Sequence, residues 1–373
     1  MIPSLENLDW RSFLARPPLP FPPAEALDAL RRESILITGA GGSIGSALAL
    51  RLGALGAPRL ALLDASESNL YALERDWAAA LAANPRSMSP MTPILGSAAD
   101  TALLQEVFAT HAPRIVFHAA AFKHVPLMEE HLLAAIANNI FVTETLAKVA
   151  ATYGARVILL STDKAVEPAS VMGATKRVAE HVVQAAGGTV LRLGNVLGSR
   201  DSVAESFARQ IAQGGPVTIT DPAARRYFLT IDEAVNLLLI AAAHPEPAAL
   251  LAPVLPSTHF IADLAQFMVS SLAPDREIAI DFTAPRPGDK DTELLWKAGD
   301  STQPTGLDGM VLVETPGLTT AQLASQLASL RAALDARYVC AAIVHLRALV
   351  PDYTPSRVVL AQSRRLNHRC IHA

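Results

Sequence analysis

The amino-acid sequence predicts an α/β protein built on a doubly wound parallel sheet, with a smaller lobe toward the C-terminus. Three observations support this fold class. Short, unbroken apolar runs recur along the chain, which is typical of strands buried on both faces of a parallel sheet. Segments with helical periodicity alternate with these runs. A glycine-rich turn joins the first apolar run to the first long helix.

Composition and charge exclude several classes of protein. The chain has 373 residues, of which 51% are hydrophobic and 18% are charged, so we expect a globular protein with a large core. A net charge of −4 gives no indication of a nucleic-acid partner. Cys340 and Cys370 are the only cysteines, which excludes a disulfide framework and a cysteine-based metal site, and we expect no metal.

The sequence also predicts a cytoplasmic protein without a membrane span. Residues 1–13 contain acidic residues and no apolar core, unlike a signal peptide. The most apolar run, Leu237 to Ala243, is far too short to cross a bilayer.

Residues 1–33 are expected to form a proline-rich arm. The segment from Arg16 to Pro23 contains too many prolines for a regular helix or a central strand. We expect it to pack against the main domain in a polyproline-like conformation, with a free linker as the alternative.

The first strand is expected at Ser34–Thr38 and the first long helix at Ser46–Leu55. The turn between them carries Gly39, Gly42 and Gly45, with Ser43 and Ile44 inside the last interval. Such a turn lets the backbone approach a pyrophosphate, and the helix N-terminus offers free N–H groups. A flexible turn is the alternative, but the strand before it and the helix after it favour dinucleotide binding.

A second strand, Arg59–Leu63, ends at Asp64. This residue follows the last glycine by about 20 residues, where an acid binds the adenosine ribose of NAD. The alternative is a cap for the next helix, and both roles are compatible. A carboxylate at this position disfavours a 2′-phosphate, so we expect NAD rather than NADP.

Further strands are expected at Ile94–Gly96 and Arg114–Phe117. After the second of these, Ala119 and Ala120 leave room for a flat cofactor against the backbone. His118 is interpreted as a packed core histidine. A long helical segment then runs to Val149, with Lys123 and His124 near its start.

The next strand, Val157–Leu160, leads into the segment Ser161-Thr162-Asp163-Lys164. In an open α/β sheet this segment would leave the strand at the edge where ligands bind. A helix is expected at Gly173–Gln184, with Lys176 four residues after Met172 and on the same face. The alternatives are an ordinary loop start for Thr162–Lys164 and a solvated charge for Lys176.

The remaining elements are less regular. A strand at Val190–Leu193 precedes Asn195, which either binds a ligand or holds a turn. Arg226 belongs to an arginine pair that suits a diphosphate, with a solvated pair as the alternative. We expect the βα domain to end at residue 250, a smaller lobe to cover 251–300, and an extension to cover 301–373. Other elements are expected at 203–213, 232–243, 261–271, 277–282 and 319–336, with a turn at 286–290.

Taken together, these segments resemble the nucleotide-sugar branch of the extended short-chain dehydrogenase/reductases, which have a Rossmann-type sheet. More narrowly, the chain resembles the CapD-like polysaccharide-biosynthesis family of UDP-N-acetylglucosamine 4,6-dehydratases over roughly residues 34–295. The matching segments are ITGAGGSIGS (37–46), LLDASESNLY (62–71), HAAAFKHVPLME (118–129), NNIFVTETL (138–146), STDKAVEPASVMGATKR (161–177), LRLGNVLGS (191–199), GGPVTITDPAARRYFLTIDEA (214–234) and RPGDK (286–290).

The resemblance implies an NAD-dependent lyase of surface polysaccharide biosynthesis. In that reaction the hexose is oxidised at C4, water is eliminated across C5 and C6, and hydride returns to C6. By resemblance, Thr162 would bind the C4 oxygen, Asp163 would protonate the leaving C6 hydroxyl, and Lys164 would take the C5 proton. Lys176 would bind the nicotinamide ribose.

The resemblance also implies a UDP-sugar substrate and a homo-oligomer. The substrate contacts would be Lys123, His124, Asn195, Arg226 and Arg286, the last of these in the smaller lobe that closes over the sugar nucleotide. The oligomer would be a dimer formed through the helices at 132–149 and 173–184.

One departure concerns Met172, where most short-chain dehydrogenases have a tyrosine that takes the C4 hydroxyl proton. A thioether has no transferable proton, so we expect Lys176, Asp163 or a bound water to replace it. Ser97 and Asp201 are smaller departures from the family pattern. The alternatives to a dehydratase are a nucleotide-sugar 4-epimerase, which needs no C5 base, and a catalytically silent NAD or nucleotide-sugar binder.

Overall fold

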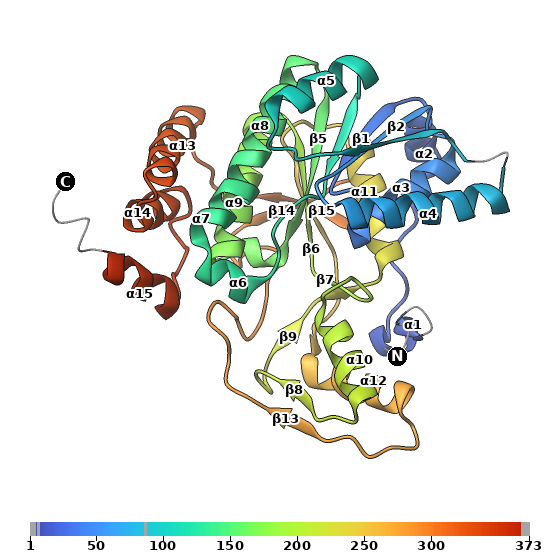
Figure 1. Ribbon diagram of the computed structural model, residues 1–373, viewed down its shortest axis with the longest axis vertical. Coiled ribbons are helices and arrows are strands. Elements are labelled where there is room, and N and C mark those ends of the chain that lie inside the picture. Colours follow the sequence, from blue (N-terminus) through green and yellow to red (C-terminus); the bar gives the residue numbers. More distant parts are fainter. Residues whose placement is uncertain (1–4, 6–7, 86–87, 367–373) are drawn as a thin grey trace.

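The protein folds around a nine-stranded sheet in the part of the chain that the computed structural model describes, residues 5, 8–85 and 88–366. The strand order is β14-β15-β11-β6-β5-β4-β1-β2-β3 (Figure 1). The strands are β1 Ser34–Thr38, β2 Arg59–Asp64, β3 Met91–Leu95, β4 Ile115–His118, β5 Arg156–Thr162, β6 Thr189–Leu193, β11 Leu250–Pro253, β14 Ser301–Pro304 and β15 Met310–Glu314. The first seven of these strands pair in parallel, which confirms the predicted fold class.

The sheet reverses its direction of growth between β1 and β4. β2 and β3 lie on one side of β1, while β4, β5 and β6 follow on the other. Such a switch point leaves a crevice beyond the carboxyl ends of the two strands, where ligands bind in open α/β sheets. The pairing of Thr38 with His118 brings the ends of β1 and β4 level, so the turns after these residues lie side by side.

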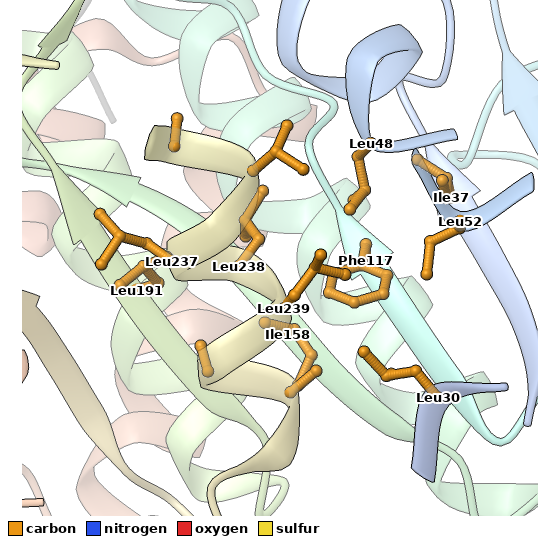
Figure 2. Close-up of a cluster of buried hydrophobic side chains, with 14 of the residues drawn as sticks. Leu30, Ile37, Leu48, Leu52, Phe117, Ile158, Leu191, Leu237, Leu238 and Leu239 are labelled. Atoms are coloured by element: carbon orange, nitrogen blue, oxygen red, sulfur yellow. The ribbon is translucent and has the colours of Figure 1, made fainter. Parts of the chain in front are cut away.

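Helices cover both faces of the sheet because alternate residues of a buried strand point to opposite sides. Ile35 and Ile37 of β1 belong to an apolar cluster with α2, α3 and α11, part of which Figure 2 shows. Leu36 belongs to another cluster with α5, α8 and α9. The helices that flank the sheet are α2 Ala24–Leu30, α3 Ser43–Leu55, α4 Glu67–Ala83, α5 Thr101–His111, α8 Thr143–Thr152, α9 Val171–Ala185 and α11 Ile231–Ala243.

A second, smaller lobe lies at the carboxyl edge of the sheet, at the bottom of Figure 1. Its apolar cluster joins residues of α1, α10 and α12 with Ile278 and the strand β8. Two short strand pairs, β7 with β10 and β9 with β12, lie between this cluster and the sheet. The elements are α1 Trp10–Leu14, β7 Asn195–Val196, α10 Val203–Gln213, β8 Val217–Ile219, β9 Arg225–Arg226, β10 Phe228–Leu229, β12 His259–Phe260, α12 Ile261–Leu272 and β13 Ile280–Phe282.

The boundaries that we expected at residues 250 and 300 do not follow this arrangement. β11 continues the main sheet beside β6, and β14 and β15 add an antiparallel hairpin at its edge. Residues 203–219, which we placed in the βα domain, pack with residues 261–282. The hairpin escaped prediction because all four residues of β14 are exposed, so no apolar run marks this strand.

The C-terminal segment forms three helices, α13 Thr320–Asp335, α14 Val339–Leu349 and α15 Arg357–Leu366. The helix expected at 319–336 is confirmed as α13, and its Leu323, Leu327 and Leu330 are buried. These helices pack on α9 and on the segment before α8, where we expected a second copy to bind. That part of the expected dimer surface is therefore buried under the chain's own helices.

The helical segment between β4 and β5 is interrupted, although the sequence predicted one continuous run. It consists of α6 Val125–Glu130, α7 Leu132–Ala135, the π-helical segment η2 Ile136–Val142, and α8. Among the described residues, the stretch Leu132–Thr152 is the one helix long and apolar enough to cross a membrane. Most of it is buried inside the protein, as in a core helix that passes the same test.

The proline-rich arm packs against the main domain, so the free-linker alternative is wrong. The Arg16 guanidinium donates to both carboxylate oxygens of Glu233, at 2.7 and 2.9 Å. The Leu19 backbone N–H also donates to Glu233, at 2.9 Å, and the Leu19 side chain is buried. Glu233 is the third residue of α11 and forms a capping box with Thr230, so the arm is fixed to the start of that helix.

We predict that Arg16→Ala lowers the free energy of unfolding by about 2–4 kcal/mol, because it leaves a buried carboxylate without its charged partner. Arg31→Ala is the matched control, since Arg31 pairs with Asp28 through side chains that are 51% and 56% exposed. Its effect should stay within about 0.5 kcal/mol. Urea unfolding measures both values, and equal losses would show that the arm does not depend on this ion pair.

Candidate active site

The glycine turn lies in the crevice between β1 and β4. Gly39 has φ +70°, and a Cβ built on it would lie 2.7 Å from the Ala120 nitrogen. A Cβ on Gly45 would overlap the Gly39 carbonyl oxygen. A side chain at either glycine would therefore push apart the backbones that meet here. Ala119 and Ala120 lie directly against the turn.

The N-terminus of α3 directly follows the glycine turn. The helix begins at Ser43, three residues earlier than we expected, and its cap residue Gly42 makes no side-chain hydrogen bond. Ser43, Ile44 and Gly45 thus form the first helical turn, whose N–H groups have no intrahelical acceptor. Backbone N–H groups and the helix dipole at such a position suit the diphosphate of a dinucleotide.

Asp64 is buried at the end of β2 and anchors the turn. Its Oδ2 accepts the Gly41 N–H at 2.8 Å, and its Oδ1 accepts the Ser66 N–H at 2.8 Å. Asp64 is not the helix cap that the alternative predicted, because Ser66 caps α4 through its own hydroxyl, which accepts the Asn69 N–H. Asp64 instead holds the turn on either side of it, through Gly41 and Ser66. Carboxylate oxygens can each accept more than one hydrogen bond, so the same group remains able to receive ribose hydroxyls. The residues of this crevice fit a dinucleotide such as NAD.

The polar side chains at the end of β5 and directly after it contact one another. Asp163 has no exposed surface, and its Oδ1 accepts from Thr162 Oγ1 at 2.9 Å and from Lys164 Nζ at 3.0 Å. Lys164 Nζ also donates to Asn195 Oδ1 at 2.9 Å. The second carboxylate oxygen of Asp163 is buried and has no hydrogen-bond partner among the described residues. This arrangement offers an acid and a base one hydrogen bond apart.

Lys176 lies on α9, and its side chain reaches β5. Its Nζ donates to the carbonyl oxygen of Leu160, on β5, at 2.6 Å. Burial lowers the pKa of Lys176 to about 8, although the nearby Glu180 carboxylate raises it in part. Met172 is buried in the apolar cluster shared with the C-terminal helices, so it contributes packing rather than a proton.

His118 is a core histidine, as its sequence context indicated. Its ring nitrogens lie 2.7 Å from Thr38 Oγ1 and 2.9 Å from Thr143 Oγ1, which satisfies both of them. Burial, and to a smaller extent the Lys176 charge, lowers the pKa of His118 to about 3. The ring is therefore neutral at physiological pH, and its role is to hold the ends of β1 and β4 against α8.

A buried charge network escaped prediction. Glu180 of α9 accepts from Ser161 Oγ at 2.6 Å, from Arg177 at 2.8 Å, and from Arg192 at 2.9 and 2.8 Å. Burial alone would raise the pKa of Glu180, but Arg192, Arg177 and Ser161 together lower it to about 2. The only sequence signal was a set of charged residues at otherwise apolar strand and helix positions. That pattern does not show which charged residues pair with one another.

A second unpredicted group lies over the glycine turn. The Arg200 guanidinium donates to Gly41 O at 2.9 Å and to Asn69 Oδ1 at 3.1 Å, and the Arg200 backbone N–H donates to Ser43 Oγ at 2.9 Å. Lys123 Nζ donates to the Arg200 carbonyl oxygen. The loop at residue 200 thus returns to the N-terminus of α3 and brings a cation to it.

His124 also faces this loop, with Nε2 3.9 Å from Asp201 Oδ2. Burial lowers the pKa of Lys123, and Asp201 raises it in part. Lys123 and His124 are thus placed together by the structure, beside the glycine turn.

Tyr227 is a further residue that sequence analysis did not single out. Its carbonyl oxygen accepts the Asn195 N–H at 2.8 Å, which places it next to the residue that binds Lys164. Burial, followed by the Asp163 carboxylate, raises the pKa of Tyr227. Its phenol therefore stays protonated and can donate a hydrogen bond.

The two arginines expected to bind phosphate differ in their surroundings. Arg226 is buried and donates to the carbonyl oxygens of Arg225, Lys290 and Asp291, at 2.7 to 3.1 Å. It ties β9 to the segment after the 286–290 turn. Arg286 lies on that turn, with its side chain 55% exposed and paired with Asp289 at 2.9 Å. In the described ranges, no group of three or more His, Cys, Asp or Glu side chains is arranged to hold a metal ion.

Comparisons with known proteins identify relatives of this chain. The sequence model of a family described as polysaccharide biosynthesis protein matches residues 35–315. The capsular polysaccharide biosynthesis protein CapD of Staphylococcus aureus is 36% identical over 302 residues, which is 78% of this chain and 50% of that protein. The chain therefore spans about half the length of this curated relative.

Solved structures show the same fold. Pen from Bacillus thuringiensis superposes with a TM-score of 0.69 at 25% identity, covering 77% of this chain and 89% of that one. The dTDP-glucose 4,6-dehydratase DesIV from Streptomyces venezuelae, solved with NAD and TYD bound, superposes with a TM-score of 0.59 at 19% identity. That alignment covers 70% of this chain and 87% of that one.

The lowered pKa of Lys176 gives a direct prediction. In protein labelled with ¹³C at the lysine ε-carbons, one signal should titrate with a midpoint of about 8, and Lys176→Arg should remove that signal. The physical reason is that burial penalises the charged ammonium. A midpoint for Lys176 at the ordinary lysine value of 10.5 would show that the amine is hydrated in solution.

Proposed function

The chain belongs to the polysaccharide biosynthesis protein family, and from this premise we propose that it is an NAD-dependent nucleotide-sugar 4,6-dehydratase. The observation that carries the proposal is the Asp163–Lys164 pair at the carboxyl end of β5, in which the fully buried carboxylate accepts from the partly exposed Lys164 amine at 3.0 Å. An acid and a base in contact are what elimination of water requires. We take UDP-N-acetylglucosamine as the substrate.

The cofactor would occupy the crevice between β1 and β4. The first turn of α3 would hold its diphosphate, Asp64 its adenosine ribose, and Lys176 its nicotinamide ribose. Arg200, whose guanidinium lies on the glycine turn, adds a cation at the same position. The buried carboxylate of Asp64 disfavours a 2′-phosphate, so NAD is proposed rather than NADP. NAD, when bound, would accept a hydride from C4 of the hexose and return it at C6.

Asp163 and Lys164 would perform the elimination between them. A proton that moves along their hydrogen bond converts the ion pair into a carboxylic acid and a neutral amine. The amine of Lys164 would then take the C5 proton, and the acid of Asp163 would protonate the leaving C6 hydroxyl. The elimination step leaves a carboxylate and an ammonium. When hydride returns to C6, the Lys164 ammonium would give a proton back to C5. The proton that Lys176 took from the C4 hydroxyl would then return to Lys164 through solvent, so these groups end each turnover as they began. Asn195 keeps the Lys164 amine in place through its Oδ1.

Lys176 and Thr162 would serve the C4 hydroxyl in place of the missing tyrosine. With a pKa of about 8, Lys176 is partly neutral near physiological pH and can accept a proton, directly or through water. Thr162 Oγ1 would hydrogen-bond the C4 oxygen. Tyr227 is unsuited to accept that proton because its raised pKa keeps the phenol protonated.

The other proposed substrate contacts differ in how their surroundings support them. Asn195 is supported by its bond to Lys164, and Lys123 with His124 by their place beside the glycine turn. Arg226 already donates to three carbonyl oxygens, so its first role is to shape the site. Arg286 would reach a diphosphate only by releasing Asp289. A cytoplasmic location stays a prediction.

A nucleotide-sugar 4-epimerase is the second candidate. It would share the C4 oxidation and the cofactor, but it needs no base at C5. The hydrogen-bonded Asp163–Lys164 pair therefore favours the dehydratase. A catalytically silent binder would need neither the oxidation at C4 nor a base at C5.

The test is to incubate the protein with UDP-N-acetylglucosamine and NAD in deuterated water and to follow the sugar by NMR and mass spectrometry. We predict the loss of one water and the appearance of deuterium at C5. Asp163→Asn and Lys164→Met should each lower the rate by about 10²–10⁴, since each removes one proton-transfer group. Lys148→Met is the matched control, because the side chain of Lys148 is 71% exposed on α8.

Other products would change the assignment. A C4 epimer without loss of water would indicate the epimerase. If no product forms but the sugar nucleotide protects bound NAD from release, the protein is a binder. Full activity in both Asp163→Asn and Lys164→Met would contradict the proposed acid–base pair.

A further inference from the structure

The three C-terminal helices lie outside the segment that the family shares. The family match ends at residue 315, and α13 begins at Thr320. We refer to residues 318–366 as the C-terminal helical unit. In Figure 1 this unit, in red, lies against the green helices α6, α7 and α9. A segment that follows the family match therefore covers a face of the matched domain.

The contact between the unit and the shared domain is a continuous apolar core. Phe141, Val178 and Val182 of the shared domain belong to the same buried cluster as Leu330 and Leu346 of the unit. Met172 belongs to it as well. Each of these side chains is at most 6% exposed. The side chains at this contact are therefore as buried as those in the interior of a domain.

A cation at the edge of the cluster adds to the seal. The Arg331 guanidinium of α13 donates to Glu144 Oε2 of α8 at 3.0 Å. The same guanidinium lies 3.5 Å from the centre of the Phe141 ring, within range of a cation–π interaction. A second copy of the chain can reach the covered part of this face only by displacing the unit.

The unit also holds the loop that connects Asp163 and Lys164 to α9. The Thr354 backbone N–H donates to the Pro168 carbonyl oxygen at 3.0 Å. Gln362 Nε2 donates to the Glu129 carbonyl oxygen at 2.9 Å, and Glu129 Oε1 accepts the Val171 N–H at 2.6 Å. These bonds fix the loop in its middle and at its end, where α9 begins.

We propose that the C-terminal helical unit is an intramolecular brace that closes this face to a second copy and fixes residues 163–171, so that the elimination pair is positioned within one chain. The closing of the face and the fixing of the loop stand on the contacts alone. The effect on the elimination pair rests on the proposed function.

The test of the brace uses the full chain. Thr354→Pro removes the N–H that binds Pro168, while Thr354→Ala keeps it, and the Thr354 side chain is exposed. Hydrogen exchange should be at least about tenfold faster across residues 163–171 in Thr354→Pro and unchanged in Thr354→Ala. Equal exchange in the two variants would overturn the brace. Should Thr354→Pro fail to fold, Gln362→Ala tests the same loop through Glu129, with faster exchange expected at Val171.

Two further readouts separate this inference from the proposed function. Hydrogen exchange in α9 and α13 should not change over a hundredfold dilution, and slower exchange there at high concentration would show that copies associate through this face. In the dehydration assay, Thr354→Pro should lower kcat at least tenfold with little change in KM. Faster loop exchange with unchanged kcat would keep the brace and contradict its link to catalysis. If even the unmodified chain forms no product, the proposed function fails and the exchange results still stand.

Discussion

Glu180, a carboxylate with no exposed surface, is the constraint on which the site depends. An unpaired charge at this depth would be very costly, so Arg192, Arg177 and Ser161 must remain in contact with it. These contacts fix α9 against β5 and β6. Arg192 also donates to Leu295 O, and Arg177 also donates to Thr315 Oγ1. The chain from Ser161 to Glu180, which contains all the proposed catalytic residues, is therefore held at both of its ends.

The C-terminal helical unit holds the same segment from the other side. Position 172 is where the two constraints meet, because Met172 belongs to the apolar cluster under α13 and α14. Most short-chain dehydrogenases have a tyrosine at this position, whose hydroxyl takes part in the reaction, whereas Met172 packs in the core. Under the proposed function, Lys176, one helical turn further on, takes over the proton-transfer role, and its amine donates to Leu160 O on β5. Met172 and the C-terminal helical unit therefore pack in the same apolar cluster.

Local patterns in the sequence predicted the central sheet, the glycine turn and the polar segment with Asp163 and Lys164 at the end of β5. These features depend on apolar runs and on residues close to a strand end, which a sequence displays directly. The Glu180 network, the return of Arg200 to the glycine turn and the β14–β15 hairpin were not predicted. The Glu180 network and the Arg200 contacts join polar residues of separate elements, which no local pattern pairs with one another. The hairpin was missed because all four residues of β14 are exposed and show no apolar pattern.

The central claim is that one site oxidises C4 and reduces C6 of the same sugar around the Asp163–Lys164 pair. The most direct measurement uses UDP-N-acetylglucosamine carrying deuterium at C4, with the position of the label in the product determined by NMR. The account predicts that the deuterium appears at C6 of a product that has lost one water. Deuterium retained at C4 of an epimer, or a substrate recovered unchanged with its label in place, would contradict it.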